Sequence, residues 1–370
     1  MPTPEELQSL REALGGVDRE LLVLVARRQA LAGRIGELKA SLGRPTRDFT
    51  QEKEVLDRAR KTAESLGLPG EIAADLLRLL ISSSLTRQER DRLAAAAGGV
   101  GRRALVIGGS GRMGGWLLRF LSSQGFGLEI ADPAAGPPDV PRIADWEESP
   151  LDHDLIVVAA TLTASATILH GLAARKPKGL VFDVGSLKGP LIPALDALRT
   201  AGVKVTSIHP MFGPNTELLS GRHVIFIDCG VPEAVAAARE LFSPTMALQV
   251  TMTAAEHDRH IAYVLGLSHA LNLIFSAVLA ESGEAAPALA SMSSTTFDAQ
   301  LAVARQVSSE NPRLYFEIQH LNQYGLEPLR ALKAAASEVL ESVKQGDEVA
   351  FATLMQRGRD YFTGRGGEAG

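Results

Sequence analysis

The sequence predicts three successive parts: an all-α helical part, an α/β part with a doubly wound parallel sheet, and a second all-α part. Apolar residues recur at strict helical spacing near the N-terminus. Short apolar runs alternate with helical stretches between residues 103 and 228, which predicts a parallel sheet with crossover helices. No strand pattern recurs beyond residue 253, and residues 94–101 form an Ala/Gly-rich break. The expected domains are 1–97, 98–250 and 251–370.

Composition is that of a soluble globular protein. Of 370 residues, 45% are hydrophobic and 22% charged, and the net charge of -5 offers no basic field for nucleic acid. The single cysteine excludes an internal disulfide and a cysteine-rich metal site, so we expect a cytoplasmic protein with no metal. Residues 155–174 and 261–280 lack formal charges over a length that could span a bilayer. The polar residues inside both favour a buried strand-plus-helix and a buried helix, with no membrane partner.

The first predicted helix has one apolar seam. Spacings of three and four residues alternate along positions 7–38, which predicts a helix roughly 50 Å long. Arg28 occupies a seam position, and Lys39 lies about three turns later on nearly the same face. Since an unpartnered buried guanidinium is costly, Arg28 is either a structural ion-pair or register-setting residue, or part of an anion site. Arg11 lies about 25 Å away on another face. One small ligand could touch both arginines only if an antiparallel second copy supplied Arg11.

A set of spaced residues in the first 90 positions matches a known pattern. The set comprises Leu10-Arg11, Val17-Asp18, Ala26-Arg27-Arg28, Lys39, Arg47-Asp48 through Glu52, and Ser84 with Gln88 one turn later. With these spacings, residues 5–90 resemble the all-helical class of chorismate mutase. The resemblance implies three helices that intertwine with a second copy of the chain and rearrange chorismate to prephenate.

The resemblance also implies a role for each residue. Arg11 and Arg28 resemble carboxylate clamps, Lys39 and Gln88 the ether-oxygen donors, Glu52 with the backbone at Asp48 the group that holds the ring hydroxyl, and Ser84 a carboxylate contact. The rearrangement is pericyclic, so the site needs only to fold a dicarboxylate and stabilise charge on the ether oxygen. One departure stands out. The family usually has a basic residue immediately before Glu52, whereas this chain has Gln51, which predicts weaker substrate binding.

A glycine motif opens the second part. Gly109, Gly111 and Gly114 form G-x-G-x-x-G between a predicted strand and a helix, and the next strand ends at Asp132. Such glycines let the backbone approach a pyrophosphate at the helix N-terminus, and an acid at this distance accepts from a ribose 2′-hydroxyl. The predicted NAD-binding residues are Gly109, Ser110, Gly111, Arg112, Met113, Gly114 and Asp132. An acid with no adjacent arginine favours NAD over NADP. The alternative is a glycine turn in an α/β fold.

Two later segments narrow the reaction. Residues 183–189 and 209–214 follow successive predicted strands, where ligands of open α/β sheets bind. A histidine at a strand end is often structural, but His209 beside a Gly/Pro-rich loop in a dinucleotide fold favours catalysis. Together with residues 255–258 and the helical C-terminal region, these segments resemble prephenate dehydrogenase. The order of mutase then dehydrogenase resembles the bifunctional T-protein family of tyrosine biosynthesis.

The second resemblance implies a Rossmann domain, a helical dimerisation domain, a homodimer, and NAD-dependent oxidative decarboxylation of prephenate to 4-hydroxyphenylpyruvate. His209 resembles the group that accepts a hydrogen bond from the ring hydroxyl, and Ser186 its orienting neighbour. The family has an arginine for the substrate carboxylate where ungapped counting places Gln306. We expect Arg305, reached by a small helical shift, to serve instead, with Arg313 and Lys333 as other candidates.

Two further hypotheses stay open at this point. The same pair of reactions could act on 4-amino-4-deoxychorismate and 4-amino-4-deoxyprephenate. Alternatively, the chain could be a non-catalytic NAD-sensing dimer, against which the intact His209, Ser186, Lys39 and Arg28 argue.

Overall fold

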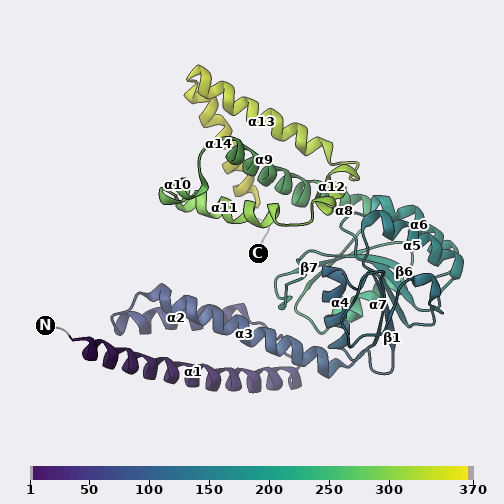
Figure 1. Cartoon of the computed structure of the whole chain (residues 1–370), viewed down its shortest axis with the longest axis horizontal. Coiled ribbons are helices and arrows are strands. Elements are labelled where there is room, and N and C mark those ends of the chain that lie inside the picture. Colours follow the sequence, from purple (N-terminus) through teal and green to yellow (C-terminus); the bar gives the residue numbers. More distant parts are fainter. Residues whose placement is uncertain (1–2, 366–370) are drawn as a thin grey trace. The chain divides into compact units, whose positions relative to one another are not determined.

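The computed structural model describes residues 3–365, and they form two compact units. The first unit contains the chain up to Ala160, Thr167–Val184 and Leu195–Thr251. The second contains Thr161–Ala166, Gly185–Ala194 and the chain from Met252 onward. The N-terminal helices and the sheet thus share the first unit, and the division into three domains stays a prediction. Figure 1 labels the elements of both units.

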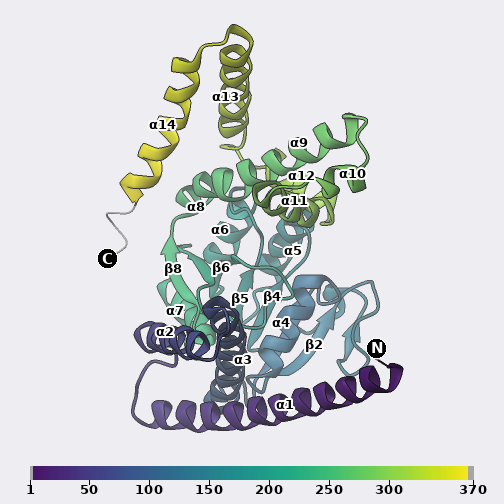
Figure 2. The ribbon, with the colours of Figure 1, turned by 90° about the vertical axis from the view of Figure 1, so that its left-hand side faces the viewer.

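Three helices open the first unit, as predicted. They are α1 (Pro4–Ser41), α2 (Phe49–Ser65) and α3 (Gly70–Ala96). Thr3 and Glu6 form a reciprocal capping box at the start of α1, which satisfies two otherwise unpaired backbone groups. The pair Gly15-Gly16 does not interrupt the helix. Figure 2 shows α1 in purple as one long helix.

The leucine seam of α1 remains uncovered in a single chain. None of the α1 residues is buried, and the seam side chains from Leu7 to Leu24 are between 47% and 69% exposed. The C-terminal half of α1 packs on α3, where Gln88 of α3 approaches Gly36 so closely that a Cβ on Gly36 would lie 2.7 Å from the Gln88 side chain. Scattered single apolar residues are normal on a surface, whereas a continuous exposed stripe is typical of a face that another protein surface covers.

The sheet that follows has the order β3-β2-β1-β4-β5-β6-β7-β8. Its strands are β1 (Arg103–Ile107), β2 (Gly127–Ala131), β3 (Arg142–Ile143), β4 (Leu155–Val158), β5 (Leu180–Asp183), β6 (Val205–Pro210), β7 (His223–Ile227) and β8 (Leu248–Met252). In sheet order, all neighbouring strands from β3 through β2, β1, β4 and β5 to β6 pair in parallel. A parallel sheet is what the sequence predicts. The order reverses beside β1, which is the point where doubly wound sheets bind ligands.

The sheet differs from the sequence prediction at one pairing and at two edges. Strand β7 runs antiparallel to β6 because residues 211–222 return directly, without the helix that a parallel crossover needs. Strands β3 and β8 were not predicted from the sequence. The first has only two residues, and the second is largely exposed, so neither produces an apolar run.

Helices and short turns connect these strands. They are α4 (Arg112–Ser122), η1 (Trp146–Glu148), α5 (Leu162–Arg175), η2 (Gly189–Leu191), α6 (Ile192–Thr200) and α7 (Pro232–Phe242). Strands β1, β4 and β5 are almost wholly inaccessible to solvent, so the predicted strand at the start of residues 155–174 is buried. In α4, Trp116 stacks on Phe120 with ring centroids 4.9 Å apart, and Phe120 stacks on Phe242 at 4.7 Å. These rings hold α4 against the first unit's core.

The segment 211–222 is fastened to α4. The Trp116 indole N–H donates to the Thr216 carbonyl oxygen at 2.9 Å, and Arg119 donates to the Pro214 carbonyl oxygen at 2.9 Å. The segment starts directly after Pro210, which follows His209 and ends β6, and it leads into β7. We name residues 211–222 the β6–β7 segment.

The second unit is helical from residue 254 onward, as predicted. Its helices are α8 (Ala254–Ile261), the π-helical turn η3 (Ala262–Leu267), α9 (Ser268–Glu281), α10 (Ala286–Ser291), α11 (Thr295–Ser308), α12 (Pro312–His320), α13 (Leu326–Gln345) and α14 (Glu348–Arg365). Helices α9 and α11 pack together, with Gln300 donating to the Asn272 side chain at 2.9 Å.

The expected burial of residues 261–280 is wrong for a single chain. Apolar side chains such as Val264, Ile274 and Val278 are at least half exposed. Among the residues that the structure describes, the run Ala254–Glu281 is the one stretch long and apolar enough to cross a membrane by length and composition, which is weak evidence by itself. An apolar helix face left open in one chain also fits packing against another protein surface.

Candidate active sites

The first candidate site is a cavity of about 130 Å³ between α1, the start of α2, and α3. The mutase candidates that line it are Arg28, Lys39, Asp48, Glu52, Ser84 and Gln88. Gln51 also lines it, at the position where the family usually has a basic residue. Arg11 is the exception, because it is exposed near the other end of α1. Residues up to 60 positions apart in the sequence therefore meet at one place.

Arg28 and Ser84 face each other across the cavity wall. The Arg28 guanidinium donates to the Ser84 hydroxyl at 3.3 Å, and that hydroxyl lies 2.7 Å from the Gln29 side-chain oxygen. Gln29 also donates to the Leu80 carbonyl oxygen at 3.3 Å, which ties α1 to α3. Sequence reasoning missed Gln29, because consecutive residues of a helix point about 100° apart and the seam pattern runs through Arg28.

Lys39 completes the cationic side of the cavity. Its ammonium donates to the Thr46 carbonyl oxygen at 3.2 Å. In the part of the chain that the structure describes, neither Lys39 nor Arg28 forms an ion pair. Partial burial lowers the pKa of Arg28 from its ordinary value, because water that would stabilise the charged form is excluded. Two cations that form no ion pair with a described carboxylate suit a dianionic ligand.

The opposite wall is the N-terminus of α2. The Asp48 carboxylate is the helix cap and accepts from the Gln51 backbone N–H at 3.0 Å. The side chain of Asp48 is thus committed to the cap, which agrees with the predicted use of its backbone. Glu52, one turn into α2, is held by Arg47 through two hydrogen bonds of 2.9 Å. Arg47 belongs to the recognised pattern, but spacing alone gave it no role.

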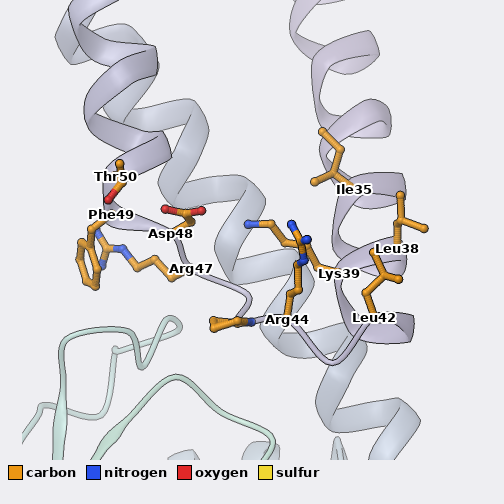
Figure 3. A pocket seen from close by; sticks show the side chains of 10 residues that line it. Ile35, Leu38, Lys39, Leu42, Arg44, Arg47, Asp48, Phe49 and Thr50 are labelled. Atoms are coloured by element: carbon orange, nitrogen blue, oxygen red, sulfur yellow. The ribbon is translucent and has the colours of Figure 1, made fainter.

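A second cavity, of about 520 Å³, lies beside the first. Lys39 and Asp48 line both cavities. Figure 3 shows Lys39 and Arg44 reaching towards Asp48, with Arg47 beside Phe49. The remaining wall comes from the apolar face of α1, including Ile35, Leu38 and Leu42.

The helices of the first cavity are joined to the nucleotide-binding sheet through Glu89. Gln88 donates to the Ala32 carbonyl oxygen at 2.6 Å, and the next residue, Glu89, is 2% exposed. The Glu89 carboxylate accepts from the backbone N–H groups of Leu219 at 2.7 Å and Met246 at 2.5 Å. Burial raises the pKa of the Glu89 carboxyl above its ordinary value, and this is the largest effect. The two backbone hydrogen bonds lower the pKa and partly offset the effect of burial.

Glu89 should therefore make stability depend on pH. A carboxyl whose pKa is raised by folding contributes stability that is present below its ordinary pKa of about 4.5 and is lost as pH rises through the folded-state pKa. Glu89→Gln removes this titration. We expect the melting temperature of the wild type minus that of the variant to fall as pH rises from 4.5 to 8, measured by circular dichroism. A difference that stays constant over this range would contradict the assignment.

The nucleotide loop has the shape that the motif predicts. Gly111 is the N-cap of α4 and forms no side-chain cap hydrogen bond, and a helix N-terminus of this kind favours an anion. A Cβ on Gly114 would lie 2.3 Å from the Gly108 carbonyl oxygen, so the loop and helix can approach only with glycine there. Gly108 itself has φ +85°, a left-handed conformation that sequence reasoning did not assign to it.

Asp132 lies at the end of β2 beside this loop. Its carboxylate accepts from the backbone N–H groups of Ser110 at 3.1 Å and Ala134 at 2.8 Å. Arg142 of β3 donates to the Asp132 carbonyl oxygen at 2.7 Å. An arginine is therefore adjacent to Asp132 in space, although none is adjacent in sequence. The carboxylate keeps lone pairs for a ribose hydroxyl while it also fixes the loop.

The remaining candidates fall in both units. His209 is 5% exposed and lies at the C-terminal end of β6, in the first unit. Ser186 belongs to the second unit and is partly exposed. Arg305 and Gln306 are both exposed on α11 of the second unit, while the buried side chains of that turn are Ala304 and Val307. The structure of one chain does not favour either residue as a carboxylate ligand.

Comparisons with known families match both ends of the chain. Residues 10–89 match the model of the family "Chorismate mutase type II". Residues 253–357 match that of "Prephenate dehydrogenase, dimerization domain". The second match includes the apolar run Ala254–Glu281. The exposed face of this run thus lies in a region that is similar to a dimerization domain.

Relatives align over nearly the whole chain. A T-protein of Enterobacter agglomerans is 26% identical over 96% of this chain and 93% of its own length, and a T-protein of Haemophilus influenzae is 23% identical over 97% and 93%. A crystal structure of prephenate dehydrogenase from A. aeolicus, in complex with hydroxyphenyl propionate and NAD+, shares the fold with a TM-score of 0.54 at 16% identity, over 71% of this chain and 98% of that chain. With a mutase match, a dehydrogenase match and relatives that span both, the chain is similar to bifunctional T-proteins over nearly its whole length.

Proposed function

We propose that the chain is a bifunctional enzyme that rearranges chorismate to prephenate and then oxidises prephenate to 4-hydroxyphenylpyruvate with NAD. The observation that carries the first activity is the cavity that Arg28 and Lys39 of α1 line together with Glu52 of α2. Arg28 and Lys39 are cations that can bind substrate carboxylates. Glu52 is an acidic residue on the opposite wall that can accept from a substrate hydroxyl. Its residue types suit a reaction that needs folding of a dicarboxylate and no covalent intermediate.

In the proposed mutase reaction, Arg28 and Ser84 hold a substrate carboxylate. Lys39 and Gln88 donate to the ether oxygen, on which negative charge develops as the C–O bond breaks. Glu52 and the backbone at Asp48 hold the ring hydroxyl. Gln51 lines the same cavity without a charge, so we expect weaker binding of chorismate than in relatives with a basic residue there.

A second copy of the chain would supply Arg11. The centre of α1 lies between residues 22 and 23. If two α1 helices pack antiparallel about that centre, residue 11 of one lies opposite residue 34 of the other, between Arg28 and Lys39. The exposed leucine seam supplies the apolar contact for such a pair. We therefore propose a homodimer in which each mutase site takes Arg11 from the other copy.

The dehydrogenase proposal rests on the first unit's nucleotide loop and His209. The fit to a dinucleotide is the close glycine approach at Gly114, at the N-terminal end of α4. Bound NAD would supply the hydride acceptor, with its ribose hydroxyls near Asp132. His209 would accept the proton from the ring hydroxyl as that oxygen becomes a carbonyl, while carbon dioxide leaves and the ring becomes aromatic.

Two assignments rest on the family resemblance alone. Ser186 stays our candidate for orienting His209, and Arg305 for binding the substrate carboxylate, with Arg313 and Lys333 as alternatives. Arg313 is engaged with Glu317, at 3.4 Å, on the surface of α12. A cytoplasmic location also stays a proposal.

Cofactor choice gives a direct test of Asp132. Asp132→Ala removes the ribose acceptor and leaves Arg142 beside the empty position, where a guanidinium can bind a 2′-phosphate. We expect weaker NAD binding and a kcat/KM ratio for NADP over NAD that rises roughly tenfold or more. Because Asp132 also fixes the loop, the melting temperature is measured in parallel. In the double variant Asp132→Ala/Arg142→Ala, the kcat/KM ratio for NADP over NAD should fall back from the raised value of Asp132→Ala. A wild type that already prefers NADP would contradict the role of Asp132.

One assay tests the whole proposal. The purified chain is incubated with chorismate and NAD, and NADH is followed by absorbance while the aromatic product is identified by mass spectrometry. Formation of 4-hydroxyphenylpyruvate supports both activities. The parallel assay with 4-amino-4-deoxychorismate tests the amino series, and higher kcat/KM there would replace the proposed substrates. Binding of NAD without turnover of either substrate would favour a sensing dimer.

A further inference from the structure

Arg47 forms the most complete set of contacts around the mutase cavity. Its Nε donates to Glu52 Oε1 and its Nη2 to Glu52 Oε2, each at 2.9 Å. Both side chains are largely shielded from solvent, with 28% of Arg47 and 19% of Glu52 exposed. A two-pronged contact of this kind fixes the plane of the carboxylate as well as its position.

The rest of the guanidinium is also held. Its Nη1 donates to the Ser220 hydroxyl at 2.8 Å, and the Phe49 ring lies 4.4 Å from its central carbon. Ser220 belongs to the β6–β7 segment, one residue after Leu219, whose backbone N–H is bound by Glu89. The β6–β7 segment is therefore fastened to α3 at Leu219 and to Arg47 at Ser220.

Helix stability does not explain a cation at this place. Arg47 precedes the N-cap of α2, where the helix dipole disfavours positive charge. The pair joins residues five apart rather than the three or four that favour contact on one helix face. The position of Arg47 thus has to be understood from what its guanidinium does to Glu52.

Arg47 reaches Glu52 from outside the first cavity. Glu52 lines that cavity. Arg47 instead lines the neighbouring cavity, whose residues are drawn in Figure 3. A carboxylate has about four acceptor positions, and the Arg47 fork uses one on each oxygen. The positions that remain can accept from a hydroxyl in the first cavity.

We propose that Arg47 is a positioning residue for the mutase reaction, which orients the Glu52 carboxylate and is itself held by Ser220 of the β6–β7 segment. Arg47 supplies a fixed positive charge to Glu52 from the side of the second cavity, whereas Gln51, which lines the first cavity with Glu52, is neutral. The mutase site is then built in part by the dehydrogenase half of the protein. This inference rests on the proposed mutase function.

The test measures kcat and KM for chorismate in the full-length protein. Arg47→Ala should lower kcat/KM roughly 10- to 100-fold, as expected for the loss of charge-assisted hydrogen bonds, and Arg47→Lys should recover part of the loss. Ser220→Ala should lower it roughly two- to fivefold, and Ser220→Thr should restore it. Arg44→Ala is the matched control, since Arg44 lines the same cavity without a hydrogen bond to Glu52.

A double-variant comparison separates positioning from a structural role. In a Glu52→Ala background, Arg47→Ala should cost no more than about twofold, because Arg47 acts through Glu52. Dehydrogenase turnover of supplied prephenate and the melting temperature should change little in the single variants.

The outcomes are distinct. A wild type that does not convert chorismate overturns the proposed function and this inference with it. An active wild type in which Arg47→Ala costs the same factor with and without Glu52 overturns the inference alone. Unchanged constants in Ser220→Ala overturn the contribution of the dehydrogenase half.

Discussion

Replacing Lys39 with alanine is expected to lower the mutase kcat about 100-fold or more, because an ammonium aimed at the developing charge of the ether oxygen acts mainly in the transition state. The ammonium forms no ion pair with the described residues and lies at the edge of the cavity, 3.2 Å from the Thr46 carbonyl oxygen. The rate is measured by the loss of chorismate absorbance at saturating substrate.

Two controls accompany the Lys39 variant. Lys53→Ala removes an exposed lysine of α2 that does not line the cavity, and it should leave kcat near the wild-type value. NAD-dependent turnover of supplied prephenate should survive in the Lys39 variant. Equal loss of both activities, with a lowered melting temperature, would show that Lys39 is structural.

Replacing His209 with asparagine is expected to lower the dehydrogenase kcat roughly 10²- to 10⁴-fold, which is the usual contribution of a positioned general base. Asparagine approximates the size of the ring and can form a hydrogen bond, but it cannot take up the proton of the ring hydroxyl. His209 lies almost fully buried at the end of β6, so a side chain of similar size limits the disturbance of the strand. NADH formation from supplied prephenate is the measurement.

The His209 variant should retain NAD binding and the mutase rate. NAD affinity is followed by fluorescence titration, since Trp116 lies in the helix that follows the glycine loop. A dehydrogenase rate within tenfold of the wild type would mean that His209 is a structural strand-end residue.

Local patterns predicted the architecture well. The seam spacing gave α1, and the run of strands and helices gave the parallel core of the sheet, because both depend on neighbours in sequence. Strand β7 escaped the pattern, since its antiparallel pairing depends on a connection without a helix and not on its own residues. The exposure of α9 also escaped it, because an apolar helix has the same sequence whether its cover comes from the same chain or another.

The mutase residues were predicted by resemblance, whereas the supports around them were not. Arg47 meets Ser220 across 173 positions, and Glu89 meets Leu219 across 130. No spacing within one helix can reveal such pairs. Arg142 beside Asp132 is the same kind of case, since a two-residue edge strand brings it there.

The uncovered seam of α1 links enzyme activity to the amount of enzyme. If Arg11 comes from a second copy, a mutase site exists only in the associated pair, whereas the glycine loop and His209 are complete within one subunit's first unit. By mass action, dilution below the dissociation constant of the α1 pairing would abolish rearrangement while the nucleotide fold persists. As the subunit concentration in a cell rises, the number of complete mutase sites would then increase more steeply than the number of folded nucleotide-binding units.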